Sequence, residues 1–125
     1  MRMHEKIIDL VARRFQVLGD RCRLRILQAL ENCPMTVNQI ADRLEASQPN
    51  ISRHLQILFD TGLVGRERSG NHTFYSIADP FVFKLCELVC HSTARRGEVL
   101  QKYALVGRKT RGGQRIKNGL PQGAN

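Results

Sequence analysis

The 125-residue sequence contains no long hydrophobic run, and this absence excludes several kinds of protein. No segment approaches the roughly 18 apolar residues of a membrane-spanning helix, so we expect no membrane segment. The first eighteen residues carry charges throughout. They lack the continuous apolar stretch of about 7–15 residues that marks a secretory signal. We therefore expect a cytoplasmic protein of the size of one domain.

Sequence signatures of enzymes are also missing. We find no glycine-rich phosphate loop, no Ser/His/Asp arrangement and no zincin spacing. The four cysteines, Cys22, Cys33, Cys86 and Cys90, form neither C-x-x-C nor zinc-finger spacing. We therefore expect no enzymatic activity, no required cofactor and, in a reducing cytoplasm, no structural disulfide.

Acidic residues are scarce, since 11 Asp and Glu face 20 Lys and Arg, for a net charge of +9. Six of the basic residues and no acidic ones follow residue 98, so residues 1–98 carry +3. Such a surplus favours a polyanionic partner, either nucleic acid or an anionic membrane surface. Residues 105–125 lack periodicity and are rich in Gly, Arg, Lys and Asn. We predict that they form a disordered basic tail after a domain of residues 1–104.

Hydrophobic spacing predicts about five helices and one β-hairpin. Apolar residues recur at helical intervals in residues 4–18, 21–31, 36–44, 47–59 and 80–90. Residues 63–68 and 73–77 have β-type composition, and residues 69–72 join them as a hairpin turn. A short helix, a tight turn, a second helix and a hairpin in this order form a helix-turn-helix followed by a wing. The fold predicted is therefore a mainly α winged helix-turn-helix.

Two helix starts within this pattern have capping residues. Thr36 is followed three residues later by Gln39, which is a capping-box pair. Ser47 can cap the next helix, with Pro49 in its first turn, where a missing N–H costs nothing. The two signals mark where the two helices begin, and the short turn between them is expected at Glu45 and Ala46.

Residues 47–60 are predicted to lie in the major groove of duplex DNA. If Ile51, Leu55 and Leu58 face the core, the opposite side of this helix faces outward. Near its N-terminus that side carries polar groups of the kind that read base edges. These candidate base-reading residues are Gln48, Asn50, Ser52 and Arg53. The alternative is that they form an ordinary solvated helix face.

A second set of residues is expected to contact the DNA backbone, from the helix start, the helix and the wing. It comprises Ser47, His54, Arg66, Arg68, Asn71 and His72. For His54 the sequence leaves packing inside the protein open as the alternative.

Four short runs resemble the ArsR/SmtB family of bacterial repressors. They are LGDRCRLRIL at residues 18–27, SQPNISRHL at 47–55, GLV at 62–64 and YSI at 75–77. The resemblance covers residues 5–95. It implies a winged-helix homodimer held by its first and last helices, with a recognition helix at residues 47–59. It also implies repression of an operon that is relieved when an inducer binds.

The metal sites that this resemblance suggests are incomplete in the sequence. Arsenic and cadmium sensors of the family carry a cysteine pair where Thr36 and Asn38 stand here. Its zinc sensors use four ligands on the last helix, of which only Asp79 has a match. The other three positions hold Phe81, Ser92 and Arg95. We therefore expect neither of these metal sites.

Cys86 and Cys90 are the remaining candidates for a sensor. They are four residues apart, so they lie on one helix face. If that helix packs at a dimer interface, two such pairs would suit a soft metal ion or a sulfur or redox species. Packing is the alternative, because cysteine is a common buried residue. Cys22 and Cys33 are weaker candidates for the same role.

The function predicted from these observations is a homodimeric, sequence-specific regulator of duplex DNA that does not engage membranes. The alternative is a winged-helix module that binds protein or RNA and has no inducer. Duplex RNA is the less suitable partner for a recognition helix, because its major groove is deep and narrow.

Overall fold

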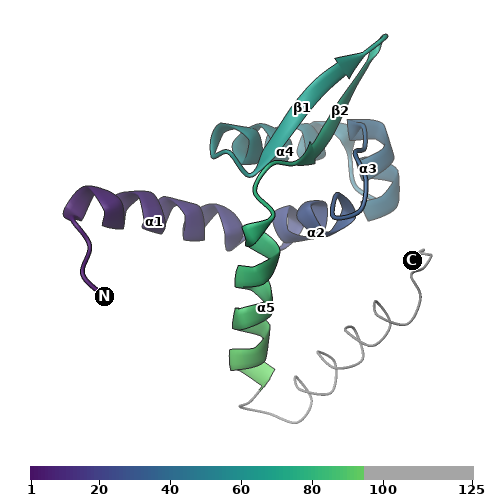
Figure 1. Cartoon of the computed structure of the whole chain (residues 1–125). Helices are drawn as coiled ribbons and strands as arrows, with labels where there is room; N and C mark the ends of the chain where they lie inside the picture. Colours follow the sequence, from purple (N-terminus) through teal and green to yellow (C-terminus); the bar gives the residue numbers. More distant parts are fainter. Residues whose placement is uncertain (95–125) are drawn as a thin grey trace. The chain divides into compact units, whose positions relative to one another are not determined.

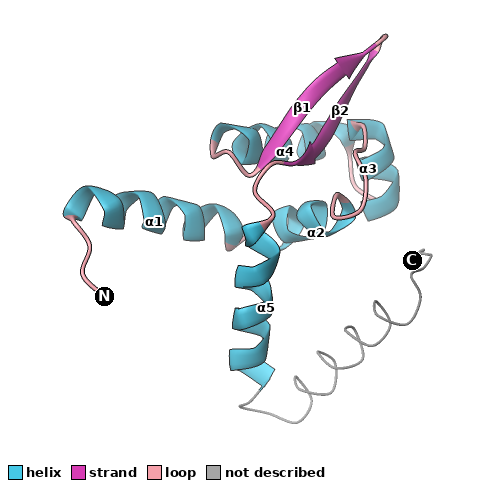
Figure 2. Cartoon of the chain, in the orientation of Figure 1, coloured by secondary structure: helices cyan, strands magenta, loops and turns pink. Residues whose placement is uncertain are grey.

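The computed structural model describes residues 1–94, and it contains the five helices and the two-stranded hairpin that the sequence predicts (Figures 1 and 2). In chain order the elements are α1 (Glu5–Leu18), α2 (Arg21–Ala29), α3 (Val37–Leu44), α4 (Gln48–Asp60), β1 (Val64–Ser69), β2 (His72–Ile77) and α5 (Phe81–Ala94). The predicted basic tail lies outside the described residues. The chain divides into two compact units, Met1–Pro80 and a second that begins at Phe81, and each is considered by itself.

Local capping determines where the helices begin. The predicted capping box is confirmed, since the Thr36 hydroxyl accepts from Gln39 N–H at 3.2 Å and the Gln39 side chain accepts from Thr36 N–H at 2.9 Å. Ser47 caps α4 by accepting from the N–H of Asn50 at 3.3 Å. Asp20 caps α2 in the same way. The sequence therefore sets locally where each helix of the helix-turn-helix begins.

The turn between α3 and α4 has an unusual backbone conformation. Glu45 adopts φ 55° and ψ 49°, the left-handed region that L-residues other than glycine seldom occupy. Its N–H bonds the carbonyls at the end of α3. This single residue reverses the chain sharply enough for α4 to start two residues later, at its Ser47 cap.

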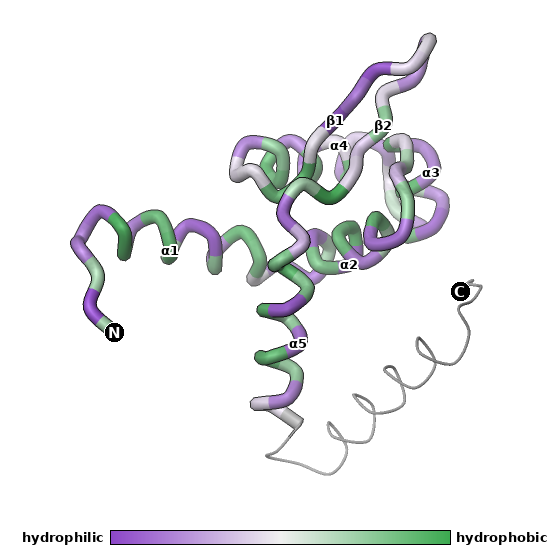
Figure 3. The backbone as a smooth tube through the Cα atoms, viewed as in Figure 1, coloured by the Kyte–Doolittle hydropathy of each residue, from purple (hydrophilic) through white to green (hydrophobic). Residues whose placement is uncertain are grey.

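The core of the first unit lies between its helices and the base of the wing. Its fully buried side chains are Val17, Ile26, Leu27, Ile40, Ile51, Leu55, Leu58, Leu63 and Val64. Apolar residues recur at intervals along α1 to α4, separated by polar ones (Figure 3). Helices α2 to α4 each bury one stripe and leave the other side to solvent, whereas α1 buries only Val17 and Leu18 at its C-terminal end. No helix in the described residues has the length and apolar character needed to cross a membrane.

The wing is an antiparallel hairpin whose ladder runs from the pair Val64 and Ile77 to the pair Ser69 and His72. Only two residues remain for the turn, where the sequence predicted four, and Gly70 adopts φ +63° as the first of them. The base of the wing is tied to the helices by an isolated bridge between Met35 and Tyr75, with N···O distances of 3.0 and 2.8 Å. The wing is thereby attached to the segment that leads into α3.

Candidate nucleic-acid interface

Helix α4 has one buried and one exposed side. Ile51, Leu55 and Leu58 are fully buried, as predicted, and they fix the rotation of the helix about its axis. Three of the four candidate base-reading residues, Gln48, Ser52 and Arg53, are exposed, and the fourth, Asn50, is half-buried. The helix therefore presents amide, hydroxyl and guanidinium groups to solvent near its N-terminus.

Two of these side chains are held against each other. Arg53 donates from Nη2 to Oδ1 of Asn50 at 2.6 Å. The amide of Asn50 thus orients the guanidinium, and the amide nitrogen of Asn50 stays available as a donor. Because Arg reads guanine and Asn reads adenine through paired hydrogen bonds, fixed orientation of both groups suits base recognition.

The N-terminus of α4 lies beside these side chains. Ser47 is exposed, and its hydroxyl oxygen accepts the Asn50 N–H as the helix cap. The positive end of the helix dipole is therefore at the exposed end that carries Gln48 and Asn50. Such an end favours a phosphate group.

His54 is the one predicted backbone-contact residue that the structure places inside the protein. It is 5% exposed, and its Nδ1 lies 3.2 Å from Nη1 of Arg23. The expectation of a phosphate contact is therefore corrected in favour of packing. Helical phase is the signal that identifies this, because His54 falls on the stripe of Ile51, Leu55 and Leu58.

The electrostatics around His54 favour a neutral ring. A guanidinium can only donate, so Nδ1 accepts and the proton of the neutral ring is on Nε2. Burial lowers the pKa of His54, and the positive charges of Arg53 and Arg23 add to this effect, while the negative charge of Asp20 opposes it. The hydrogen bond from the backbone N–H of Arg23 holds the pKa of the Asp20 carboxyl below its usual value, although burial opposes that shift.

Arg66 joins the wing to α4, a contact that sequence reasoning did not predict. Its guanidinium carbon lies 3.9 Å from the centre of the Phe59 ring, and its Nη1 donates to Gln56 Oε1 at 3.3 Å. Gln56 in turn donates to Asp60 at 2.9 Å. No local spacing signals this contact, because Arg66 and Phe59 come from different elements. Arg66 is exposed, and its predicted phosphate contact stays a prediction.

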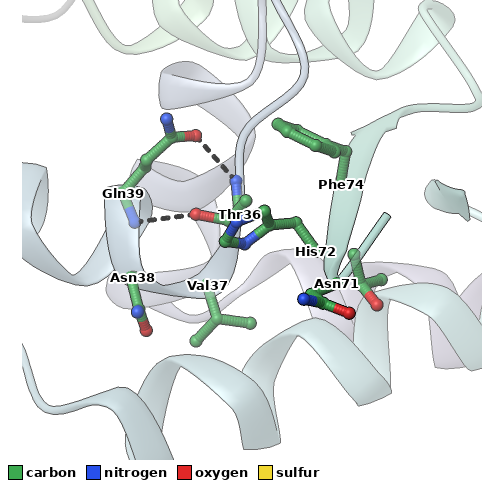
Figure 4. Close-up of a pocket in the computed structure, with 8 residues that line it drawn as sticks. Thr36, Val37, Asn38, Gln39, Asn71, His72 and Phe74 are labelled. Carbon is green, nitrogen blue, oxygen red and sulfur yellow. Dashed lines mark hydrogen bonds between the residues drawn. The ribbon is translucent and has the colours of Figure 1, made fainter. Parts of the chain in front are cut away.

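The end of the wing carries the remaining candidates, Arg68, Asn71 and His72, all exposed. Between the wing and the start of α3 lies a shallow cleft of about 430 Å³ (Figure 4). Its lining residues are Thr36, Val37, Asn38, Gln39, Asn71, His72, Thr73 and Phe74. None of them carries a carboxylate, so the cleft offers amide, hydroxyl and imidazole groups with nothing that repels a phosphate.

The four cysteines lie on α2, in the loop that follows it, and on α5. Cys22 is half-buried on α2 and Cys33 is exposed in the following loop, while Cys86 is half-buried and Cys90 exposed on α5. All four are free thiols, and burial raises the pKa of the Cys86 thiol. Among residues 1–94 no group of three or more His, Cys, Asp or Glu side chains could hold a metal ion. The sensing role of Cys86 and Cys90 stays a prediction.

Comparison with known proteins agrees with this geometry. The family model for bacterial regulatory proteins of the arsR family matches residues 20–65, which run from the α2 cap into β1. An uncharacterized HTH-type transcriptional regulator of Methanocaldococcus jannaschii is 40% identical over 90 residues, 71% of this chain and 97% of the relative. The probable mercury resistance operon repressor of Streptomyces lividans is 38% identical over 80 residues, 64% of each chain.

One solved structure has a similar fold. It is the homodimeric winged helix-turn-helix DNA-binding domain, fragment 1–100, of a possible ArsR-family transcriptional regulator from Mycobacterium bovis. Its sequence is 32% identical, the match covers 74% of this chain and 88% of that one, and the TM-score is 0.64. The chain described here belongs to the ArsR/SmtB family of transcriptional regulators, with the winged helix-turn-helix fold that its sequence predicts.

Proposed function

We propose that this chain is a homodimeric repressor that binds operator DNA, with α4 in the major groove and the wing beside it. The exposed side of α4 is the observation that carries the proposal. Its polar groups are oriented, as Arg53 is by Asn50 at 2.6 Å, while its opposite side is fixed in the core. Gln48, Asn50, Ser52 and Arg53 would read base edges, and Ser47, Arg66, Arg68, Asn71 and His72 would contact the backbone.

The exposed apolar residues of α1 support a dimer. Ile7, Ile8, Leu10 and Phe15 are 45%, 38%, 68% and 53% exposed. Exposed apolar groups gathered on one helix mark an interaction surface in a small protein. On α5 the exposed apolar residues are Phe81, Leu88 and Val89. A second copy of the chain, bound through α1 and α5, would cover both sets, and the relative from Mycobacterium bovis is homodimeric.

Selection from a library of randomised DNA duplexes tests this function. We expect enrichment of two inverted half-sites with centres about 34–36 Å apart, because a two-fold symmetric dimer presents two recognition helices. Gel-shift assays should then show preference for the selected duplex over random DNA and over duplex RNA, and light scattering should give the mass of a dimer. Equal binding to RNA, or no enriched sequence, would favour the alternative of an RNA-binding or protein-binding module.

Cys86 and Cys90 are proposed as the inducer site. They lie four residues apart on α5, and both are free thiols. Two thiolates from each subunit would suit a soft metal ion, and one relative is named as a mercury resistance operon repressor. The raised pKa of Cys86 means that metal binding must displace its proton, so binding should strengthen as pH rises.

An anaerobic titration of the protein–operator complex with Hg²⁺ tests the inducer proposal. A ligand that prefers the free protein must weaken operator binding, by about 5–150-fold for ordinary coupling energies. The double variant Cys86→Ser, Cys90→Ser should bind DNA normally and lose this response. The matched variant Cys22→Ser, Cys33→Ser should keep it. If the Cys86/Cys90 variant kept the response and the Cys22/Cys33 variant lost it, Cys22 and Cys33 would become the proposed inducer site. If the native protein responded neither to Hg²⁺ nor to an oxidant, the proposal of a cysteine inducer site would be contradicted.

A further inference from the structure

We propose that Arg14 and Arg23 are positioning residues that clamp the recognition helix α4 to α1 at two points. We call these two arginines and their contacts the arginine clamp. The inference rests on the proposed function, because it concerns how α4 is presented to DNA. It assigns a role in recognition to two residues that lie outside the DNA-facing set.

The first point of the clamp is the C-terminal end of α4. Arg14, on α1, donates from Nη2 to the carbonyl oxygen of Thr61 at 3.1 Å and from Nη1 to Oδ2 of Asp79 at 2.8 Å. Thr61 is the C-cap of α4, where carbonyls have no partner within the helix and the dipole is negative. Arg14 therefore supplies a cation at the end of α4 that favours one, while Asp79 holds the same guanidinium in place.

The second point lies near the middle of α4. Arg23 donates from Nε to the carbonyl oxygen of Val17 at 2.7 Å, in the last turn of α1. Its Nη1 donates to Nδ1 of His54 at 3.2 Å. The backbone N–H of Arg23 is itself fixed by the Asp20 cap at 3.0 Å. One planar guanidinium thus joins the end of α1 to the buried ring of α4.

The two points lie on one side of α4. His54 and Thr61 are seven positions apart, which is about two helical turns. A single contact would leave a pivot, whereas two contacts separated along the axis resist both tilt and rotation. Because α1 carries the exposed apolar residues proposed for the dimer, the orientation of α4 relative to α1 would set the separation of the two recognition helices. That separation selects the spacing of half-sites in the operator.

Lysine cannot reproduce either contact in full. The guanidinium of each arginine bonds two acceptors at once from fixed positions on a plane, whereas an ammonium is a compact point charge. The chain also offers matched controls. Arg13, on α1, bonds Gln16 of its own helix at 3.3 Å, and Arg25 is exposed on α2. Their replacement removes the same charge from the same two helices and leaves the clamp intact.

The test compares the full-length variants Arg14→Gln and Arg23→Gln with the controls Arg13→Gln and Arg25→Gln. The DNA probes are the selected operator and two derivatives whose half-site spacing is one base pair shorter or longer. We expect the clamp variants to remain dimers and to bind the operator about 2- to 30-fold more weakly. They should also lose much of the native preference for one spacing. The controls should keep both affinity and preference, and Arg14→Lys and Arg23→Lys should lie between.

Hydrogen exchange of the α4 amides in DNA-free protein separates this inference from the proposed function. The clamp predicts faster exchange in α4 of the Gln variants, with the Lys variants intermediate and the controls like the native protein. Unchanged exchange, or an unchanged spacing preference in folded variants, overturns the clamp whether or not DNA is the partner. If either Gln variant fails to fold, the corresponding Lys variant takes its place, because native-like exchange and spacing preference there also overturn the clamp. A different outcome is that the Gln variants exchange faster in α4 while the native protein prefers no DNA sequence. That outcome would contradict the proposed function and not the clamp.

Discussion

Nη1 of Arg23 lies 3.2 Å from Nδ1 of His54, across 31 positions of the sequence, and this contact joins α2 to the buried side of α4. The contact requires a neutral imidazole, because the guanidinium can only donate. A proton on Nδ1 would remove the acceptor and place a second cation beside Arg23. The recognition helix is therefore attached to the core through a histidine whose pKa burial lowers, so that its ring favours the neutral form.

The first prediction is that stability falls in mild acid through His54. Its folded-state pKa is lowered from 6.5, so the folded protein binds this proton less readily than the unfolded chain does. The contribution to stability is thus fully present above pH 6.5 and is lost as pH falls through the lowered pKa. Among the groups that shift this pKa, only Asp20 attracts the proton, and Arg23 and Arg53 repel it.

Urea unfolding between about pH 8 and about pH 5 measures this effect. The variant His54→Gln should unfold more easily at the upper end and show a shallower loss of stability on acidification. His72→Gln, which changes an exposed histidine of the wing, should keep the native pH dependence. If His54→Gln lost stability on acidification as steeply as the native protein does, a group other than His54 would be responsible for the pH dependence.

How much of this could be predicted from the sequence depends on the range of each interaction. The caps at Thr36 and Ser47 follow from residues within three positions, so the helix boundaries around the helix-turn-helix were predictable. The exposed side of α4 followed from helical phase. The bond between Arg14 and Asp79 spans 65 positions, and the contact of Arg66 with Phe59 joins two elements. Such contacts depend on how elements pack, which no local pattern specifies.

The second prediction concerns the strained turn at Glu45. A non-glycine residue in the left-handed region costs roughly 1–2 kcal/mol, and the greater freedom of glycine in the unfolded chain offsets part of that cost. Glu45→Gly should therefore raise the free energy of unfolding by up to about 1 kcal/mol. Arg43→Gly, inside α3, should lower it by about 1 kcal/mol. Thermal unfolding of both variants checks this, and a less stable Glu45→Gly protein would contradict the strain argument.

The third prediction concerns the exposed apolar residues of α1. Leu10→Glu should place a charge where the partner subunit is proposed to bind, with a loss of roughly 1.5–3 kcal/mol of apolar burial for each subunit. Sedimentation should show more monomer, and operator affinity should fall in parallel. Gln16→Glu, on a different side of α1, adds the same charge and should leave the dimer intact. A dimer unaffected by Leu10→Glu would exclude this surface of α1 as the interface.

The fourth prediction is that Asn50 and Arg53 act as a unit in DNA recognition. Since the 2.6 Å bond orients both side chains, Asn50→Ala should also disturb the contacts of Arg53. A double-mutant cycle on the selected operator should give a coupling energy of about 0.5–3 kcal/mol. A cycle between Asn50 and Arg68, which lies on the wing, should be close to additive. Additive effects at Asn50 and Arg53 would mean that their bond has no role when DNA is bound.

The ratio of affinities for the selected operator and for a random duplex of equal length, measured with Arg53→Ala at fixed salt, tests the central claim most directly. If Arg53 reads a base edge from the exposed side of α4, operator affinity should fall by about 1–3 kcal/mol, with a much smaller loss on random DNA, so that the ratio drops. Equal losses on both duplexes would show that Arg53 contacts only phosphates. An unchanged affinity for the operator would contradict the assignment of α4 as the recognition helix.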